Sequence, residues 1–503
     1  MASIETLERN YLNNPDRNIL FALLTDFADS EDCRMPQDRD LLSSIEEGLA
    51  KLNTAHGVYG VGPFLHFHRE RRWHDIDKIW MGWERKRGKL AEFNRLLSGD
   101  ESTSFMQRIG DKRRLAGISL VVTLDADSEL APGGIARLVG ILRHPLNRAS
   151  ISQETGFVTN GYGVLQPRPV QVHGGKESLF ERLFYPQVET LDRESVEPSI
   201  HQDFFDSGLF FGKGIYDATI FERSLEGRIP ENSVLSHDKL EGFHARTAYI
   251  SDVTILETAP VNYLAHRKRM HRWVRGDYQL LPWLWAQVPL ADGTKGPTKL
   301  NWYDRWRLLC DLIGPASGIS TFLLFVATLL GVLPGDIVIW LIVLAVLSSG
   351  GFLCHMIHSL TALLTDQRSF GGARKGLASF FSRCGSSVRT ARRDFTVWLL
   401  GMVFMADSAL VNLDAIIRAI YRMNVSRRLL LEWVTATEAT KKLAEARAVQ
   451  YWQQMIRTPV LSLVLVTLVA ILNPVAIPFS WPVFLIWFMS PQLAFWLAKH
   501  DTT

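Results

Sequence analysis

The sequence predicts an α/β domain followed by an α-helical transmembrane region. Through the first 310 residues, short apolar and β-branched runs alternate with amphipathic stretches, a pattern typical of a sheet with helices packed on it. After residue 311, several long stretches contain no Lys, Arg, Asp or Glu, and each is long enough to cross a bilayer. A chain of 503 residues also exceeds one ordinary core, which agrees with two regions.

Composition narrows the class of protein. The net charge is +3, from 55 basic and 52 acidic residues, so nothing indicates a nucleic-acid partner. The cysteines are scattered and form no CxxC pair, which argues against a zinc site or a disulfide framework. Such usage fits a reducing compartment for the soluble part. The four cysteines are Cys33, Cys310, Cys354 and Cys384.

Residues 1–300 form the predicted α/β domain. Strands are expected at 19–24, 118–124, 163–166, 208–211 and 248–256. Amphipathic stretches at 89–97 and 132–142 predict helices between them.

The membrane region is predicted to consist of two hairpins. The stretches 312–333 and 337–363 carry no charged residue, so we expect two spans within a first hairpin at 301–365. The stretch 458–498 is about twice as long as one span needs and is interrupted at Asn473-Pro474. It predicts two further spans, joined by a tight turn, in a second hairpin at 458–503.

The segment between the hairpins, 366–457, is predicted to be cytoplasmic. Seven basic residues and no acid lie in 367–393, which by the positive-inside rule places this segment and the α/β domain in the cytoplasm. The apolar stretch 395–417 contains Asp407, Asn412 and Asp414. We therefore expect an interfacial helix there, although the sequence leaves open whether the stretch crosses the membrane.

The strongest local motif is an apolar strand that ends in two carboxylates, Asp125 and Asp127, one residue apart. Ligands of open α/β sheets bind beyond the carboxyl ends of the strands. Alternate positions on a strand face the same side, so both side chains can converge on one hard cation such as Mg²⁺ or Mn²⁺. A sugar-nucleotide diphosphate needs such a cation. The alternative is a strand that ends in an Asp-rich turn.

Two further positions suit a sugar nucleotide. The strand at 19–24 leads to Asp26, where a carboxylate could hold a uracil or a ribose. Lys89 follows a basic cluster and lies at the start of a predicted helix, where cations would bind a diphosphate. The alternative for Lys89 is a solvated, charged helix start.

Two later motifs suit transfer to a hydroxyl group. Asp238, before a predicted helix, is the candidate base that takes the acceptor's proton, and an N-capping Asp is the alternative. A basic and aromatic run then precedes the first span. Within it, Arg272 could neutralise a diphosphate and Trp273 could stack on a sugar ring. The alternative is a juxtamembrane stretch that binds anionic lipid.

The order of these motifs resembles the family 2-like processive glycosyltransferases, such as cellulose and hyaluronan synthases. Arg269, Arg272 and Trp273 look like their QxxRW motif, with Arg in place of Gln. Ser236-His237-Asp238 looks like their TED motif, with His in place of Glu. Gln166 lies where these enzymes carry a Gln near the substrate.

Longer phrases resemble one relative more closely, the cyclic β-1,2-glucan synthase family. The phrases are FALLTDFADS (21–30), WMGWERKRGKL (80–90), GKGIYD (212–217), IPENSVLSHDKLEG (229–242), HRWVRGDYQLLPW (271–283) and SRRLLLEW (426–433). The resemblance implies a GT-A-like (Rossmann-like) domain, UDP-glucose as donor, Mg²⁺ or Mn²⁺, a β-1,2-glucan product and a bacterial inner membrane. It also implies contact with a glucan acceptor and membrane lipid.

The chain also departs from that family. A GT-A-like fold should have a strand before the one at 19–24, yet only about 18 mostly polar residues precede it, so we expect that strand to be missing. Family members also carry a glycoside-phosphorylase-like module, so the chain resembles a fragment whose partners include that module. Two other functions stay open: synthesis of another β-glucan, and an inactive sugar-nucleotide-binding membrane subunit. A transporter is disfavoured because the predicted spans carry no ionisable pairs.

Overall fold

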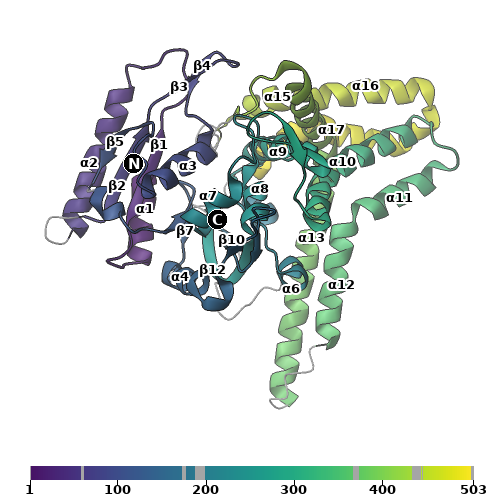
Figure 1. Cartoon of the computed structure of the whole chain (residues 1–503). Helices are drawn as coiled ribbons and strands as arrows, with labels where there is room; N and C mark the ends of the chain where they lie inside the picture. Colours follow the sequence, from purple (N-terminus) through teal and green to yellow (C-terminus); the bar gives the residue numbers. More distant parts are fainter. Residues whose placement is uncertain are drawn as a thin grey trace.

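The computed structural model describes residues 2–57, 62–110, 112–172, 177–186, 199–365, 373–432, 443 and 446–499. Within these residues an α/β part occupies one side of the molecule and a bundle of long helices the other (Figure 1). The sequence prediction of an α/β part followed by helices is confirmed.

The first sheet is built around a parallel pair of strands. The elements are α1 (Ala2–Asn13), β1 (Phe21–Asp26), α2 (Asp38–His56), β2 (Phe64–Arg69) and β5 (Phe105–Ile109). The strand order is β1-β2-β5, with β1 parallel to β2 and β5 antiparallel to β2. A parallel pair requires a crossover, which α2 supplies. Strand β2 was not predicted because its buried residues mix apolar and polar side chains without regular alternation, including His66 and Arg69.

The second sheet has the order β6-β11-β10-β12-β7, in which only β10 and β12 are parallel. Its strands are β6 (Leu120–Thr123), β7 (Glu129–Leu130), β10 (Val164–Val172), β11 (Gly214–Asp217) and β12 (Thr247–Thr258). The predicted strands at 118–124, 163–166 and 248–256 overlap β6, β10 and β12, and the one at 19–24 overlaps β1.

The predicted strand at 208–211 is wrong. This segment has no ladder partner in the described sheets and passes over the second sheet as irregular backbone. Its amides bond singly: Gly208 N donates to Thr247 O at 2.7 Å, and Phe211 N donates to the side-chain oxygen of Gln166 at 2.8 Å. Gly212 then turns the chain with φ +74°, and the strand β11 begins only at Gly214.

Short hairpins and helices complete the α/β part. The hairpins pair β3 (Arg72–His74) with β4 (Ile79–Met81), β8 (Ser150–Ile151) with β9 (Val158–Asn160), and β13 (Gln287–Pro289) with β14 (Lys295–Pro297). The helices are α3 (Arg85–Leu97), α4 (Gly134–Arg143), α5 (Leu179–Phe184), α6 (Ile200–Phe205), α7 (Ala218–Leu225), α8 (His237–Ala245) and α9 (Tyr263–Tyr278). The predicted helices at 89–97 and 132–142 are confirmed as parts of α3 and α4.

One hydrophobic core joins both sheets. Phe21 and Phe64 of the first sheet belong to the same buried cluster as Leu165 and Ile255 of the second, together with Leu138 of α4. Packing across this cluster places the ends of β1 and β6 in one α/β unit. The side chains that follow these strands can therefore contribute to one site.

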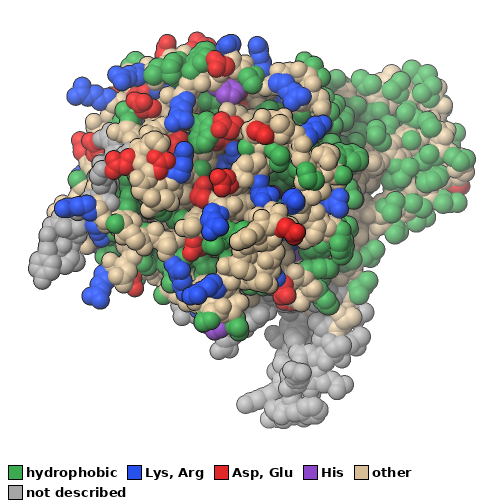
Figure 2. Space-filling view, in the orientation of Figure 1, with side chains coloured by type: hydrophobic (Ala, Val, Ile, Leu, Met, Phe, Trp, Pro, Cys, Tyr) green, Lys and Arg blue, Asp and Glu red, His purple; other side chains and the backbone are tan. Residues whose placement is uncertain are grey.

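Long apolar helices form the second part. They are α10 (Trp302–Leu329), α11 (Ile337–Ser348), α12 (Gly350–Thr365), α13 (Ala373–Tyr421), α15 (Ala448–Met455), α16 (Arg457–Leu472) and α17 (Ile477–Leu497). By length and composition, three segments could cross a membrane: Trp302–Leu329, Ser387–Ser426 and Pro474–Leu497. The pair α15 and α16, bent by 58°, could be a fourth. Figure 2 shows hydrophobic side chains gathered over this region and charged ones spread over the α/β part.

The predicted spans are confirmed in part. The stretch 312–333 lies mostly in α10, and 458–498 breaks at Asn473 as expected. Within the expected span at 337–363 the helix is interrupted, because α11 ends at Ser348 and α12 begins at Gly350. The Ser-Ser-Gly-Gly sequence at 348–351 favours this break, since serine and glycine are poor helix formers. A helix of 12 residues spans about 18 Å, which is short of a bilayer core of about 30 Å.

The expected interfacial helix at 395–417 is part of α13, a helix of 49 residues. The segment Ser387–Ser426 of this helix is long and apolar enough to cross a membrane, so length and composition do not support the interfacial placement. Parts of the predicted basic segment, 366–372 and 433–442, lie outside the described residues.

Candidate functional site

The two carboxylates of the DxD motif lie just beyond the end of β6. Both oxygens of Asp125 contact ammonium groups: Oδ1 lies 2.6 Å from Lys86 Nζ and Oδ2 lies 3.2 Å from Lys213 Nζ. Lys86 also donates to the carbonyl of Gly212 at 2.8 Å. The structure thus joins the first turn of α3, the end of β6 and the loop before β11.

The two aspartates experience opposite electrostatic environments. Burial would raise the pKa of Asp125, but Lys86 and Lys213 outweigh it and hold the pKa well below its usual range. Burial raises the pKa of Asp127, and the negative charge of Asp125 raises it further. A cation placed between the two carboxylates would relieve this repulsion.

The donor set suits a hard divalent cation. Asp125 and Asp127 offer carboxylate oxygens, which Mg²⁺ and Mn²⁺ prefer, and the repulsion between them is what such an ion would offset. The ammonium groups of Lys86 and Lys213 already pair with both oxygens of Asp125. A cation would therefore draw mainly on the carboxylate of Asp127. Within the described residues, the group of three possible ligands that lie closest together is instead His237, Asp238 and Glu241.

Asp238 stands at the start of α8, facing the same loop. A side-chain carbon at Gly212 would lie 2.5 Å from Asp238 Oδ1, so only glycine allows this approach. Oδ1 is buried and accepts no hydrogen bond from any described residue. The alternative of an N-capping Asp is wrong, because α8 begins at His237 and the cap position is Ser236.

A buried histidine and glutamate flank Asp238. His237 Nδ1 lies 2.9 Å from Glu241 Oε1 and 3.3 Å from Asp238 Oδ1. Burial would lower the pKa of His237, but Glu241 and Asp238 outweigh it, so the pKa is raised and the imidazolium is favoured. Burial raises the pKa of Asp238, against the opposing effects of His237 and Lys86. A raised pKa is the direction that would suit a carboxylate acting as a general base.

A second ionic cluster forms at the end of β1. Asp26 Oδ1 accepts from Arg69 Nε at 2.7 Å, and Oδ2 lies 3.0 Å from Lys89 Nζ. Arg69 is fully buried and also contacts Glu92 at 3.3 Å. Burial would raise the pKa of Asp26, but Lys89 and Arg69 outweigh it and lower the pKa. Lys86 and Lys89, one turn apart on α3, thus connect the two acidic clusters.

Replacing Asp26 by Asn is expected to destabilise the fold by about 1–3 kcal/mol, because it removes one of the two carboxylates, with Glu92, that pair with the buried Arg69. The change would be measured as a lower midpoint in denaturant unfolding of the purified protein. Asp29→Asn is the matched control, since its pair with Arg85 is more exposed and should cost less than about 1 kcal/mol. Equal midpoints for the two variants would contradict a structural role for Asp26.

Helix α9 brings the basic and aromatic run to the same place. The Arg269 guanidinium lies 4.4 Å above the ring of Trp273, and it is 3.8 Å from Glu257 Oε2. Glu257 also contacts Lys213 at 2.6 Å, which links α9 to the lysine that holds Asp125. Trp273 is 42% exposed and can offer a free ring face.

Arg272, on α9, is subject to the charges of both aspartates of the DxD motif. Burial and the neighbouring Arg269 lower the pKa of Arg272, and the charges of Asp125 and Asp127 oppose that effect. The role of Arg272 at a diphosphate site stays a prediction.

Gln166 lies on β10 behind this site. Its amide nitrogen donates to Pro167 O at 2.8 Å, and its oxygen accepts from Phe211 N at 2.8 Å. These bonds fix the backbone that leads to Gly212 and Lys213. The Gln166 side chain is buried, and it holds the segment that contains Phe211.

Four charged residues of the site were missed from the sequence. Lys86 was seen only as part of a basic cluster, and Arg69 lies on the unpredicted strand β2. Lys213 stands alone between two glycines, and Glu257 lies at the end of a long strand, so neither shows a local pattern. The phrase GKGIYD, which carries part of the resemblance, was the only available signal for Lys213.

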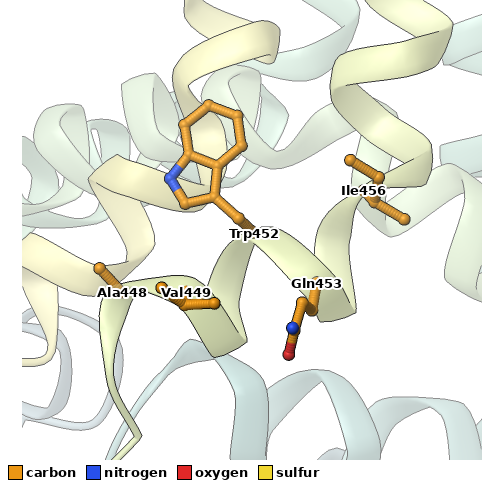
Figure 3. A pocket seen from close by; sticks show the side chains of 5 residues that line it. All are labelled: Ala448, Val449, Trp452, Gln453 and Ile456. Atoms are coloured by element: carbon orange, nitrogen blue, oxygen red, sulfur yellow. The ribbon is translucent and has the colours of Figure 1, made fainter.

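The pocket on α15 is separate from this site. Its volume is about 450 Å³ and it is lined by Ala448, Val449, Trp452, Gln453 and Ile456. Figure 3 shows four of these side chains on α15 and Ile456 just after it, and none of them is a predicted site residue.

The α/β unit carries clustered acids and bases beyond its strand ends, and it is joined to three helical segments that are long and apolar enough to cross a membrane. No family model matches the chain. The chain is similar to the cyclic β-(1,2)-glucan synthase NdvB of Rhizobium meliloti (strain 1021), with 36% identity over 509 residues. The match covers 99% of this chain but 17% of the relative. The resemblance predicted from the sequence phrases is confirmed.

Proposed function

We propose that the chain is an inverting, processive glycosyltransferase that moves glucose from UDP-glucose onto a growing β-1,2-glucan. The observation that carries the proposal is the convergence of Asp125, Asp238 and Arg272 on one site in a chain similar to a cyclic glucan synthase. A site that only binds a sugar nucleotide has no need of a carboxylate base. The α/β part would be a GT-A-like domain corresponding to residues 1–300.

The donor would lie across the ends of β1 and β6. Uridine would occupy the region of Asp26, whose ion pairs with Arg69 and Lys89 hold it rigid. The diphosphate would lie between Lys89 and Arg272, close to the lysines that contact Asp125. A bound Mg²⁺ or Mn²⁺ ion, held by Asp125 and Asp127, would stabilise the negative charge that develops on the departing diphosphate.

Asp238 would act as the base. Its Oδ1, which accepts no hydrogen bond from the described residues, would take the proton from the 2-hydroxyl of the terminal glucose of the acceptor. The oxygen of that 2-hydroxyl forms a bond to the anomeric carbon of the donor glucose while the bond from this carbon to the phosphate oxygen breaks. An α donor therefore gives a β linkage and UDP. Arg272 stabilises charge that appears mainly in the transition state, and Trp273 stacks on the acceptor sugar.

The helical part would hold this site at the cytoplasmic face of a bacterial inner membrane. The proposed hairpins, 301–365 and 458–503, contact lipid, and the segment 366–457 lies between them. Exposed apolar side chains such as Ile339 (62%) and Ile471 (70%) support a lipid environment. A glycoside-phosphorylase-like module or other synthase parts would be the protein partners.

The test is incorporation of labelled glucose from UDP-glucose by membranes that contain this chain, with Mg²⁺ or Mn²⁺ present. Polymer with β-1,2 linkages is the expected product. A polymer with other linkages would support the transferase activity but show that the product is another β-glucan. UDP binding without any polymer would favour an inactive sugar-nucleotide-binding subunit.

Transfer is expected to fall on the acid side as Asp238 takes up a proton. Because burial raises the pKa of Asp238 above its usual 3.8, the acid limb of the rate profile should lie above that pH. His237→Gln removes a positive charge beside Asp238, so the acid limb should move to higher pH. The measurement is initial rate against pH for both proteins, and an unmoved limb would argue against Asp238 as the titrating base.

A further inference from the structure

Helix α9 carries a second, regular row of polar side chains. Tyr263, Arg267, His271 and Arg275 recur every fourth residue and so share one face of the helix. We call these four residues the α9 ridge. Figure 1 places α9 between the α/β part and the long helices. The proposed function uses Arg269, Arg272 and Trp273 of this helix and none of the ridge.

The first half of the ridge meets a buried acid of α13. Tyr263 Oη and Arg267 Nε each donate to Asp407 Oδ2 at 2.9 Å. Thr458 of α16 donates to Asp407 Oδ1 at 3.1 Å. Asp407 is fully buried, so the three donors satisfy both of its oxygens.

The second half of the ridge continues along the same partner. His271 Nε2 lies 2.9 Å from Asp414 Oδ2, two turns beyond Asp407 on α13. Arg275 Nη1 lies 2.9 Å from Glu432 Oε2, in the loop that follows α13. From Arg267 onward, each step along the ridge therefore meets the next acid along the neighbouring chain.

These contacts account for the acids that interrupt the apolar segment of α13. A carboxylate inside a membrane helix is costly unless it is paired, and the α9 ridge supplies the partners. Removal of one partner of a buried pair leaves an uncompensated charge and costs about 3–5 kcal/mol. Sliding α9 by one turn would separate several pairs at once, so the ridge fixes the register of α9 on α13.

The register of α9 determines where its other residues lie. Arg272 and Trp273 directly follow the ridge residue His271, and Arg269 lies between Arg267 and His271. We propose that Asp407 and Asp414 are positioning residues for glucose transfer, which hold α9 so that Arg269 keeps its contact with Glu257 and Arg272 stays beside the proposed site. This inference rests on the proposed function, because it assigns Arg272 to the transfer site.

The test is a double-mutant cycle in the full chain. Asp407→Asn is expected to lower the rate of transfer by about tenfold or more, since misplacement by about 1 Å can cost up to about a hundredfold. In an Arg272→Gln background the same change should cost less than about twofold, because the residue it positions is gone. His271→Gln is a second variant with less risk to folding, because the contact between His271 and Asp414 is more exposed than the contact at Asp407. Asp394→Asn, whose ion pair with Arg393 stays within α13, is the matched control.

Hydrogen–deuterium exchange of α9 gives a readout that does not depend on activity. Exchange of 263–278 should increase in Asp407→Asn and stay unchanged in Asp394→Asn. A wild-type chain that neither transfers glucose nor binds UDP would defeat the proposed function, yet the exchange data would still decide whether Asp407 holds α9. Equal losses of transfer in both backgrounds, or unchanged exchange in α9, would overturn the inference.

Discussion

Replacing Asp238 by Asn is expected to lower glucose transfer by about 10²–10⁴-fold, the usual contribution of a general base. The amide keeps the size of the side chain next to Gly212 but cannot take up the proton of the acceptor hydroxyl. The affinity for UDP should stay close to that of the wild type, because the lysines near the diphosphate are unchanged. Initial rates of labelled glucose incorporation and calorimetric UDP binding measure the two quantities.

Asp252→Asn is the matched control for this prediction. Asp252 is an aspartate of β12 whose ion pair with Arg137 is at the surface, so its loss should leave the rate nearly unchanged. A variant at Asp238 that keeps most of the wild-type rate would remove this residue from the role of base. A loss of UDP binding together with transfer would instead indicate that Asp238 supports the donor site.

Arg272→Gln is expected to lower transfer by about 10²–10³-fold, the usual effect of removing one group that stabilises a developing negative charge. The charges of Asp125 and Asp127 act on Arg272, and in the proposed mechanism the change removes a cation from the place where the diphosphate would depart. The loss should appear mainly in kcat, because the charge develops mainly in the transition state. Rates measured over a range of UDP-glucose concentrations separate kcat from KM.

Lys268→Gln, on the same helix but exposed, is the control for the loss of one positive charge near the membrane. It should change the rate by less than about twofold, since exposed charges interact weakly through water. Similar losses for both variants would show that the net charge of α9 matters more than the position of Arg272. That result would favour lipid binding by this basic run.

Sequence patterns located the site where strands end in acids. Asp26 follows β1 and Asp125 follows β6, and alternating structure was enough to predict that both lie beyond strand ends. The same reasoning did not predict a strand whose buried side chains are polar. Strand β2 holds His66 and Arg69 inside the protein, so its hydrophobic pattern is broken and the strand was not predicted.

Helix breaks show a similar limit. The stretch 337–363 carries no charge and therefore predicted a span, but composition does not report where the backbone bends. The break between α11 and α12 depends on small residues and on the packing of α12 against α13. The opposite case is Asn473-Pro474, where proline itself marks the turn between α16 and α17.

The sequence by itself determined the order of the parts, the acids that follow β1 and β6, and the resemblance to cyclic glucan synthases, because these depend on local patterns. Only the tertiary structure decided which charges meet. Lys213 reaches Asp125 across 88 positions and Arg267 reaches Asp407 across 140, and no local period encodes such pairs. Packing of sheets and helices sets these contacts, since the cost of an unpaired buried charge requires each carboxylate to find its partner wherever the fold provides one.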